Sequence, residues 1–175
     1  MVYGVRVAEE LRKSGVGLTI VVTDAARRVL AHEMPQALGE LGKFGEVLSE
    51  HDIEADVASG SVKVDATVIC PCSMKTLSAV ANGYSHNLIC RCADVALKEH
   101  RRLVLVVRET PLSAIHLENM LKLARLRVTI LPASPGFYHN PKTVDDLVNH
   151  VVGKVLDSLG VSSDLFKRWS GGTGA

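Results

Sequence analysis

Short runs of apolar and mostly β-branched residues recur along the chain, with helical patterns between them. The runs span residues 18–22, 67–70, 103–107 and 128–131. Runs this short, with little polar alternation, are typical of strands that are buried on both faces. Strands of this kind that alternate with helices form a parallel sheet with helices on both sides. The sequence therefore predicts an α/β fold.

The segments between the runs begin with residues that cap helices or carry apolar residues at helical spacing. Thr23 with Asp24 and Ser73 are the clearest of these caps. We expect helices over 5–13, 24–32, 37–49, 73–83, 87–100, 113–126 and 143–159. No repeat or linker interrupts the pattern, so one domain over 1–169 is expected, followed by a flexible, Gly-rich tail over 170–175.

Composition excludes several classes of partner. Lys and Arg number 20 and Asp and Glu number 19, which gives a net charge of +1. This balance provides no basic surface for nucleic acid or for an anionic membrane. The apolar runs are too short to cross a bilayer, and the N-terminus has no signal-peptide pattern. We therefore expect a cytoplasmic protein that binds neither nucleic acid nor membrane.

Four cysteines form two Cys-x-Cys pairs, Cys70 with Cys72 and Cys90 with Cys92. Structural zinc sites usually place two to four residues between paired cysteines. On a helix, Cys90 and Cys92 would also point in widely different directions. We therefore interpret the cysteines as small core residues and expect no metal, with zinc as the lesser alternative.

Ligands of open α/β sheets bind beyond the carboxyl ends of the strands, and hydroxyl groups follow two of the expected strands. Thr23 follows the first, and the segment Ser73, Met74, Lys75 and Thr76 follows the second. A hydroxyl group at a helix N-terminus can bind a phosphate. The alternative is that both residues are simple helix caps. The second segment lacks the glycines of a P-loop.

Charged residues lie near the same strand ends. Arg91, Asp94 and Lys98 share one face of an expected helix, where they form either an exposed ion-pair ladder or two cations directed at an anion. Arg108 and Glu109 follow the third strand directly. They are either a surface pair or part of a site.

Tyr138 lies in a loop that two prolines and a glycine restrain, and its hydroxyl group could donate to a phosphate oxygen. A packed loop anchor is the alternative. Lys154 lies at the edge of the apolar stripe of the last helix, where a long side chain usually reaches solvent. Glu33 ends a helix, where the helix dipole disfavours a carboxylate. Together these residues suggest a cleft for a phosphorylated ligand.

Several long segments resemble the UbiX family of flavin prenyltransferases. They are VICPCSMKTL at 68–77, ADVALKE at 93–99, VRETPL at 107–112, IHLENM at 115–120 and PGFYH at 135–139. The segment YGVR at 3–6 and the pair Arg168 and Trp169 also match. The resemblance covers nearly the whole chain, in the order and at the spacing of the family.

The resemblance implies a Rossmann-like (flavodoxin-like) three-layer sandwich with a parallel sheet. It implies a homododecamer with active sites at subunit interfaces. The expected reaction is a metal-independent prenyl transfer, in which a dimethylallyl group from dimethylallyl phosphate joins reduced FMN at N5 and C6. The prenylated FMN then serves UbiD-type decarboxylases, which include those of ubiquinone synthesis and aromatic acid breakdown.

The resemblance also implies roles for individual residues. The FMN-binding set is Thr23, Ser73, Met74, Lys75, Thr76 and Arg91. The set for the prenyl phosphate is Lys98, Arg108, Tyr138 and Lys154, with Glu109 in the same pocket. Glu33 matches a carboxylate that takes part in proton transfer, and Trp169 an aromatic beside the prenyl site, so that Glu33, Glu109 and Trp169 are the expected catalytic group.

Three features depart from the family pattern. The family has a strand and a Gly-rich phosphate loop ahead of Tyr3, where this sequence has Met1 and Val2. We therefore expect either an interruption in the centre of the sheet with weaker FMN binding, or a sheet that oligomer contacts or a rearranged strand repair. Arg127 stands where the family has Gly, and Lys154 where it often has Arg, so a point charge replaces a bidentate guanidinium. Two alternatives remain, a non-catalytic, flavin-deficient subunit that only assembles the oligomer, and a flavin-dependent cysteine decarboxylase.

Overall fold

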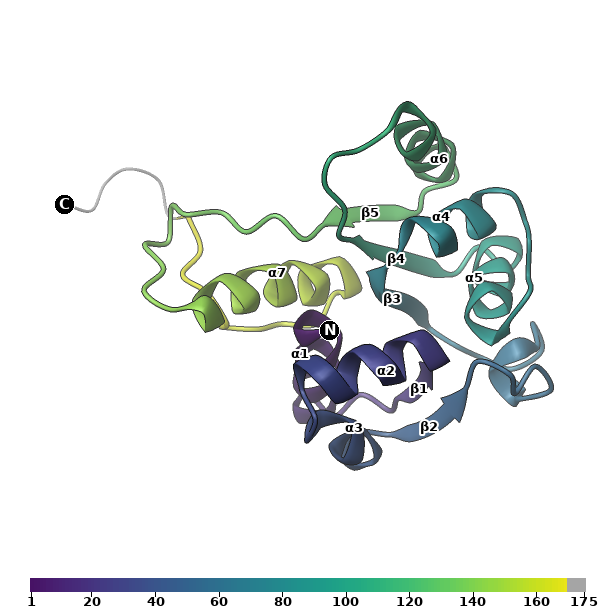
Figure 1. Ribbon diagram of the computed structural model, residues 1–175, viewed down its shortest axis with the longest axis horizontal. Coiled ribbons are helices and arrows are strands. Elements are labelled where there is room, and N and C mark those ends of the chain that lie inside the picture. Colours follow the sequence, from purple (N-terminus) through teal and green to yellow (C-terminus); the bar gives the residue numbers. More distant parts are fainter. Residues whose placement is uncertain (170–175) are drawn as a thin grey trace.

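Parallel strands alternate with helices throughout residues 1–169, the part of the chain that the computed structural model describes (Figure 1). The predicted tail at 170–175 lies outside the described residues. The strands are β1 (Thr19–Val22), β2 (Glu46–Ser49), β3 (Ala66–Cys72), β4 (Arg102–Val107) and β5 (Thr129–Pro132). The helices are α1 (Val2–Lys13), α2 (Asp24–Glu33), α3 (Ala37–Glu40), α4 (Met74–Ala81), α5 (Leu88–Lys98), α6 (Ala114–Arg125) and α7 (Val144–Leu159).

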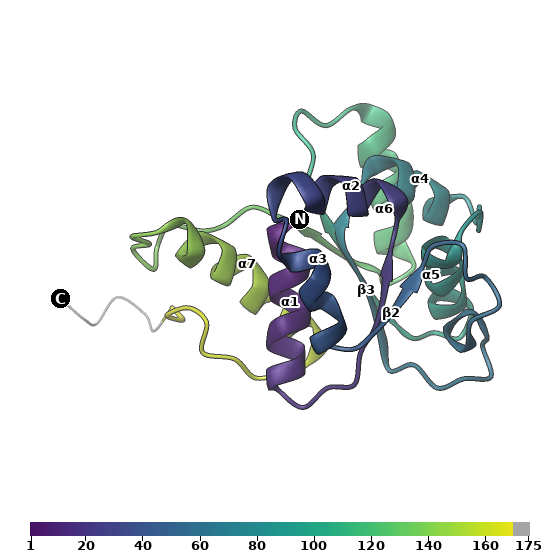
Figure 2. The ribbon, with the colours of Figure 1, turned by 60° about the horizontal axis from the view of Figure 1, so that its bottom comes forward.

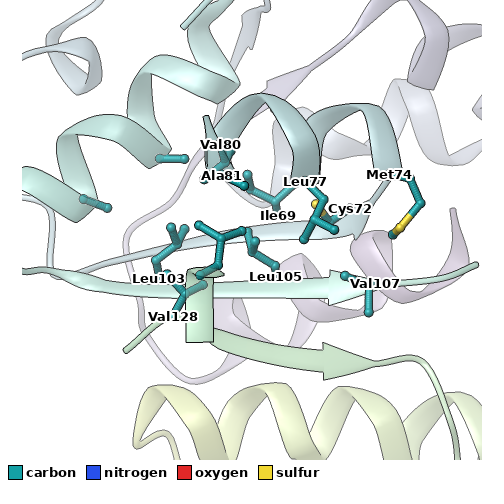
Figure 3. Packing of buried hydrophobic residues seen from close by; sticks show 13 residues of the cluster. Ile69, Cys72, Met74, Leu77, Val80, Ala81, Leu103, Leu105, Val107 and Val128 are labelled. Atoms are coloured by element: carbon teal, nitrogen blue, oxygen red, sulfur yellow. The ribbon is translucent and has the colours of Figure 1, made fainter. Parts of the chain in front are cut away.

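Two helical layers cover the faces of the sheet, as the uniformly apolar sequence of β4 requires. Leu103, Leu105 and Val107 pack in a cluster with α4, α5 and α6 (Figure 3). Val104 and Val106, between them on the strand, pack against α1 and α7 on the other face. Successive side chains of a strand point to opposite faces, so a strand buried on both sides is apolar at every position. The predicted three-layer sandwich is confirmed.

The strands form two separate hydrogen-bonded sheets. β1 pairs with β2, and β3 with β4 and β4 with β5, all in parallel. Among the described residues no ladder joins β1 to β3. Helix α1 passes beside β3, where a Cβ atom at Gly4 would overlap the carbonyl oxygen of Cys70. Figure 2 shows α1 running lengthwise past the strands. Of the two alternatives, the described residues therefore show the interruption, with β1 and β2 in one sheet and β3, β4 and β5 in another.

The expected helix over 37–49 is wrong in its second half. Helix α3 ends at Glu40, a 3₁₀ turn covers Leu41–Lys43, and residues 46–49 form β2. Gly45 packs directly against the backbone of Leu18, and Val47 lies opposite Ile20 in the pairing of β2 with β1. This pairing is a tertiary contact that outweighs the local helical pattern. Smaller differences are that β3 continues through Pro71 and that α1 begins at Val2.

Arg127 adopts a left-handed backbone conformation, which explains why the family has Gly at this position. Its φ is 65°, in the left-handed region, directly after the C-cap of α6. The N–H of Arg127 donates to Ala124 O and that of Val128 to Leu123 O, which closes the helix end. A residue with a Cβ atom is strained there and glycine is not.

We expect Arg127→Gly to raise the free energy of unfolding by about 1 kcal/mol, because glycine removes the left-handed strain. Thermal denaturation should show a rise in Tm of roughly 2–4 °C. Arg125→Gly, in the last helical turn two residues earlier, is the matched control and should lower Tm, since glycine disfavours a helix interior. A lower Tm for Arg127→Gly would contradict the interpretation.

Candidate functional site

Capped helix N-termini gather at the carboxyl edge of the strands. The Thr23 hydroxyl oxygen, after β1, accepts a hydrogen bond from the Ala26 N–H at 2.9 Å. The Ser73 oxygen, after β3, accepts from the Thr76 N–H at 3.3 Å and lies 3.1 Å from the Thr76 hydroxyl. Both expected caps are confirmed, and both helix N-termini favour an anion or a polar ring edge beside them.

The members of the 73–76 segment differ in exposure. Ser73 and Lys75 are exposed and Thr76 is partly buried. The Met74 side chain is buried in the cluster with α4 and β4, so the part of Met74 nearest the edge is its backbone in the first turn of α4. Its predicted contact with a flavin therefore falls to the backbone.

Glu50, which the sequence analysis did not single out, connects three elements at this edge. Its carboxylate accepts from the Asp24 N–H at 2.8 Å and from the Asn87 side chain at 2.6 Å. Partial burial alone would raise the pKa of Glu50, but these two hydrogen bonds hold that pKa below its ordinary value. Glu50 thereby fixes the first turns of α2 and α5. Its signal in the sequence is only its position one residue beyond β2.

Arg91 lies in the first turn of α5 and is partly buried. Its Nε donates to Ala58 O at 3.1 Å and its Nη1 to Asp94 at 3.1 Å. The ion pair with Asp94 confirms that the two share a helix face. Within residues 1–169 no protein partner is recorded for Nη2, so one donor of a positioned guanidinium stays available to a ligand at this edge.

Lys98 lies at the opposite edge of the sheet. It is the last residue of α5, which leads into the first residue of β4, whereas Arg108, Tyr138 and the helix N-termini follow the ends of strands. The Lys98 ammonium pairs with Glu99 at 2.5 Å. Within one chain the structure therefore does not bring Lys98 together with the other residues expected to hold the prenyl phosphate.

Glu33 lies near the start of α1, with Arg108 close enough to influence its charge. The ammonium group of Met1 donates to Glu33 at 2.8 Å. This bond lowers the pKa of Glu33, and Arg108 is close enough to lower the pKa further. Glu109 and Arg108 are both exposed, and the Glu109 carboxylate accepts from the Thr110 N–H at 3.1 Å. The end of β4, which carries Arg108, therefore lies near the Glu33 carboxylate, which is ionised at neutral pH.

Tyr138 lies in an aromatic cluster with His150 of α7 and with Trp169. Its hydroxyl oxygen is 3.1 Å from Nε2 of His150, and the Tyr138 and Trp169 ring centroids are 6.2 Å apart in an edge-to-face arrangement. Lys154, one helical turn after His150, is exposed and lies on the same side of α7. The structure thus places Tyr138 against Trp169, and Lys154 one helical turn along α7 from the partner of Tyr138.

Asp157 fixes the segment that carries Trp169. Arg168 donates to both carboxylate oxygens of Asp157, at 2.9 and 2.7 Å, and the Lys154 ammonium is 3.7 Å away. The bond from Arg168 is the main cause that lowers the pKa of Asp157. Figure 1 shows that the segment after β5 and the segment after α7 both run along α7. Sequence analysis missed Asp157, whose only signal is its spacing of three from Lys154.

We expect Asp157→Asn to release the 160–169 segment, because an amide replaces the carboxylate that binds the guanidinium in bidentate form. Trp169 is the chain's only tryptophan, so its fluorescence anisotropy should fall and its quenching by acrylamide should rise. Asp164→Asn removes the same charge nearby without an ion pair to Arg168 and should leave both signals near those of the parent chain. Equal changes in the two variants would contradict the role of Asp157.

The cysteines lie where thiols are unreactive. Cys72 and Cys90 are buried, and burial raises the pKa of Cys70 and of Cys72 to about 12. A protonated thiol is a poor nucleophile and metal ligand. Within residues 1–169 the cysteines belong to no group of metal-ligating side chains. The interpretation as core residues is confirmed for Cys72 and Cys90.

Two shallow hollows mark the surface. One of about 420 Å³ lies against α4 and is lined by Lys75, Ser78, Ala79, Asn82, Tyr84 and His86. The other, of about 300 Å³, is lined by residues of the 139–146 and 164–167 segments. Neither contains the full set of expected phosphate-binding residues. No helix of the described residues is long and apolar enough to cross a membrane.

The chain matches the family model described as Flavoprotein over residues 1–156. The flavin prenyltransferase UbiX of Methanothermobacter thermautotrophicus is 49% identical over 98% of this chain and 90% of that protein. This chain belongs to the UbiX family of flavin prenyltransferases. A crystal structure described as a dodecameric FMN-dependent UbiX-like decarboxylase from Escherichia coli O157:H7 is 42% identical, covers 97% of this chain and 92% of that one, and has a TM-score of 0.93. AnUbiX (PadA1) in complex with FMN and dimethylallyl pyrophosphate is 40% identical, covers 97% and 90%, and has a TM-score of 0.94.

The residues of this UbiX family member suit an FMN ligand. Hydroxyl groups and backbone donors lie at the N-termini of α2 and α4, and Arg91 adds a cation in the first turn of α5. A flavin ring needs such donors for its polar edge, and its phosphate needs N–H groups and positive charge. Gly4, at its close approach to Cys70, admits no side chain at this edge.

Proposed function

We propose that the chain is a flavin prenyltransferase that joins a dimethylallyl group from dimethylallyl phosphate to reduced FMN. The observation that carries the proposal is the similarity over 97% of the chain to a relative solved with FMN and dimethylallyl pyrophosphate. The donor set of Thr23, Ser73, Thr76 and Arg91 supports it at the FMN side. When bound, reduced FMN supplies the nucleophilic ring positions that accept the dimethylallyl group.

On the donor side, Tyr138 and Lys154 bind the phosphate as it leaves. Both lie on one side of α7, where the hydroxyl group donates and the ammonium neutralises charge. Positive charge that is already in place as the phosphate departs stabilises the transition state more than the bound substrate. Arg108, exposed at the end of β4, contributes a guanidinium to the same phosphate.

Trp169 and the Tyr138 ring protect the allyl group as positive charge develops on it. Their edge-to-face contact places aromatic surface beside the phosphate-binding side chains. An aromatic face stabilises a nearby cation and excludes the water that would otherwise capture it. Glu33 and Glu109 are the carboxylates that accept or hold a proton during the reaction.

A second subunit completes the site. Lys98 lies at the edge of the sheet opposite Tyr138, so the Lys98 that meets the phosphate comes from a neighbouring chain. The E. coli relative described as dodecameric supports assembly of this kind. We extend the dodecamer to this chain, together with a cytoplasmic location, one domain over 1–169 and delivery of prenylated FMN to a UbiD-type decarboxylase.

The test is anaerobic incubation of the purified chain with reduced FMN and dimethylallyl phosphate, followed by mass spectrometry of the flavin. We expect a flavin with one added dimethylallyl group. FMN titration with gel filtration accompanies the assay. An assembled protein that neither retains FMN nor modifies it would contradict the proposal and favour the non-catalytic subunit. Release of carbon dioxide from a peptide with a C-terminal cysteine would favour the decarboxylase instead.

A further inference from the structure

His150 is a buried histidine on the side of α7 that the 136–139 loop and Phe166 cover, and 7% of its surface is exposed. At 100° per residue it points away from Val148 and Val152, which pack in the core on the other side of the helix. A polar ring in such a position needs hydrogen-bond partners for both nitrogens, since an unpaired buried polar group is destabilising. The expected activity gives it no role.

Both nitrogens of His150 have partners in the loop that carries Tyr138. The Gly136 N–H donates to Nδ1 at 3.2 Å, and Nε2 lies 3.1 Å from the Tyr138 hydroxyl oxygen. Because a backbone N–H can only donate, Nδ1 must be the unprotonated nitrogen. The single proton of the neutral ring is therefore on Nε2, which donates to Tyr138.

The surroundings keep the ring neutral. Burial lowers the pKa of His150 below its ordinary value, and His139 and Lys154 lower this pKa further. His139 stacks on His150 with ring centroids 4.9 Å apart. The Phe166 ring packs edge-to-face against His150, with ring centroids 4.7 Å apart. The titratable groups that face His150 are thus Tyr138, His139 and Lys154. A second proton on Nδ1 would also meet the Gly136 N–H.

A hydroxyl group that accepts a hydrogen bond from one side has its own proton left for another acceptor. Tyr138 is half exposed, so the direction of that proton is open to a ligand. In a flexible loop the hydroxyl group would sample several directions and lose entropy when it binds.

We infer that His150 is a positioning residue, which donates from Nε2 to the Tyr138 hydroxyl oxygen and so turns the Tyr138 proton toward the phosphate of the prenyl donor. The inference rests on the proposed function for the identity of that phosphate. The same bond, with the bond from Gly136, holds the 136–138 loop on α7 beside Lys154.

Three substitutions separate the two hydrogen bonds of His150. In His150→Gln, a side-chain N–H lies near the position of Nε2 and keeps the bond to Tyr138. In His150→Asn, a side-chain oxygen lies near the position of Nδ1 and keeps the bond from Gly136. In His150→Phe, a ring remains but both hydrogen bonds are lost. We expect His150→Asn and His150→Phe to raise the KM for dimethylallyl phosphate about tenfold, the value of one hydrogen bond. His150→Gln should stay near the parent KM, and FMN affinity should be unchanged in all three.

A double-mutant cycle with Tyr138→Phe supplies the decisive comparison. If His150 acts through the hydroxyl group, His150→Phe should add no further rise in KM to that of Tyr138→Phe. Independent, additive effects would overturn the inference, as would a parent-like KM for His150→Asn alongside a raised KM for His150→Gln. His139→Phe, which changes the stacked ring without touching either bond, is the matched control and should keep the parent KM.

A spectroscopic measurement distinguishes failure of the inference from failure of the proposed function. Two-bond ¹H–¹⁵N spectra of the intact protein with ¹⁵N-histidine should show His150 as the Nε2–H tautomer near neutral pH. The His150→Gln variant assigns the signal, and Tyr138→Phe should shift its Nε2 resonance. An imidazolium or an Nδ1–H tautomer overturns the inference whatever the activity. The expected tautomer with no prenyl transfer by the parent chain overturns the proposed function alone.

Discussion

A mixture of Lys98→Ala and Lys154→Ala subunits should recover part of the prenyl transfer activity that each variant alone has lost. Each substitution removes a cation that binds the phosphate, which is worth about 2 kcal/mol and lowers kcat/KM roughly thirtyfold. Lys98 ends α5 at the amino edge of β4, while Lys154 lies on α7 beside Tyr138. If each site takes these lysines from different subunits, about a quarter of the sites in a random mixture contain both.

The measurement is the prenylation rate of co-expressed variants, purified through a different tag on each. Tyr138→Phe mixed with Lys154→Ala is the matched control, because the bond that His150 of α7 donates to Tyr138 holds Tyr138 and Lys154 of one chain on the same side of α7. That mixture should show no gain over its components. Recovery in neither mixture would mean that Lys98 acts within its own chain or not at all, and would remove the second subunit from the site.

Local signals in the sequence were sufficient for the helix starts and for the central strand. Thr23, Ser73, Asn87, Ser113 and Thr143 all cap helices through their own side chains. A cap needs only a residue and the next three N–H groups, so it can be recognised without tertiary information. The apolar sequence of β4 over residues 103–107 is equally local, because burial on both faces leaves no polar position there.

Features that depend on distant partners were not predictable in this way. The strand over 46–49 exists because it pairs with β1, and the helical spacing of the same residues pointed to the wrong structure. Glu50 and His150 gain their roles from Asn87 and from the loop at 136–138, far away in the sequence. Helical spacing places His150 off the apolar stripe of the last helix, so its burial comes from the loop and from Phe166 and has no local sign in the sequence.

The position of Lys98 was in principle available from topology. A helix that connects two parallel strands runs antiparallel to them, so its last residue lies at the amino edge of the sheet. Lys98 could therefore be assigned from the topology alone to the edge of the sheet opposite Arg108, although both cations were expected in one pocket. Family resemblance supplied their common role, and this topology is the reason for the proposal that two chains share the site.

Arg91→Gln should weaken FMN binding without unfolding the protein. The guanidinium holds Ala58 O and Asp94 and keeps a donor for the ligand, so the substitution removes a charge-assisted interaction. We expect the Kd for FMN to rise roughly thirtyfold, equivalent to about 2 kcal/mol. Gln retains an N–H that can still reach Ala58 O, so thermal stability without FMN should change little.

Fluorescence titration of FMN measures the affinity, and thermal denaturation without flavin measures the stability. Asp94→Asn is the matched control, since it breaks the ion pair of Arg91 but leaves the guanidinium and its bond to Ala58. Its Kd for FMN should stay within about threefold of the parent value, the size of an exposed ion pair. An unchanged Kd in Arg91→Gln would remove Arg91 from the FMN site. Equal weakening in both variants would instead mean that Asp94 orients the guanidinium, because the charge of Arg91 then acts only when its direction is fixed.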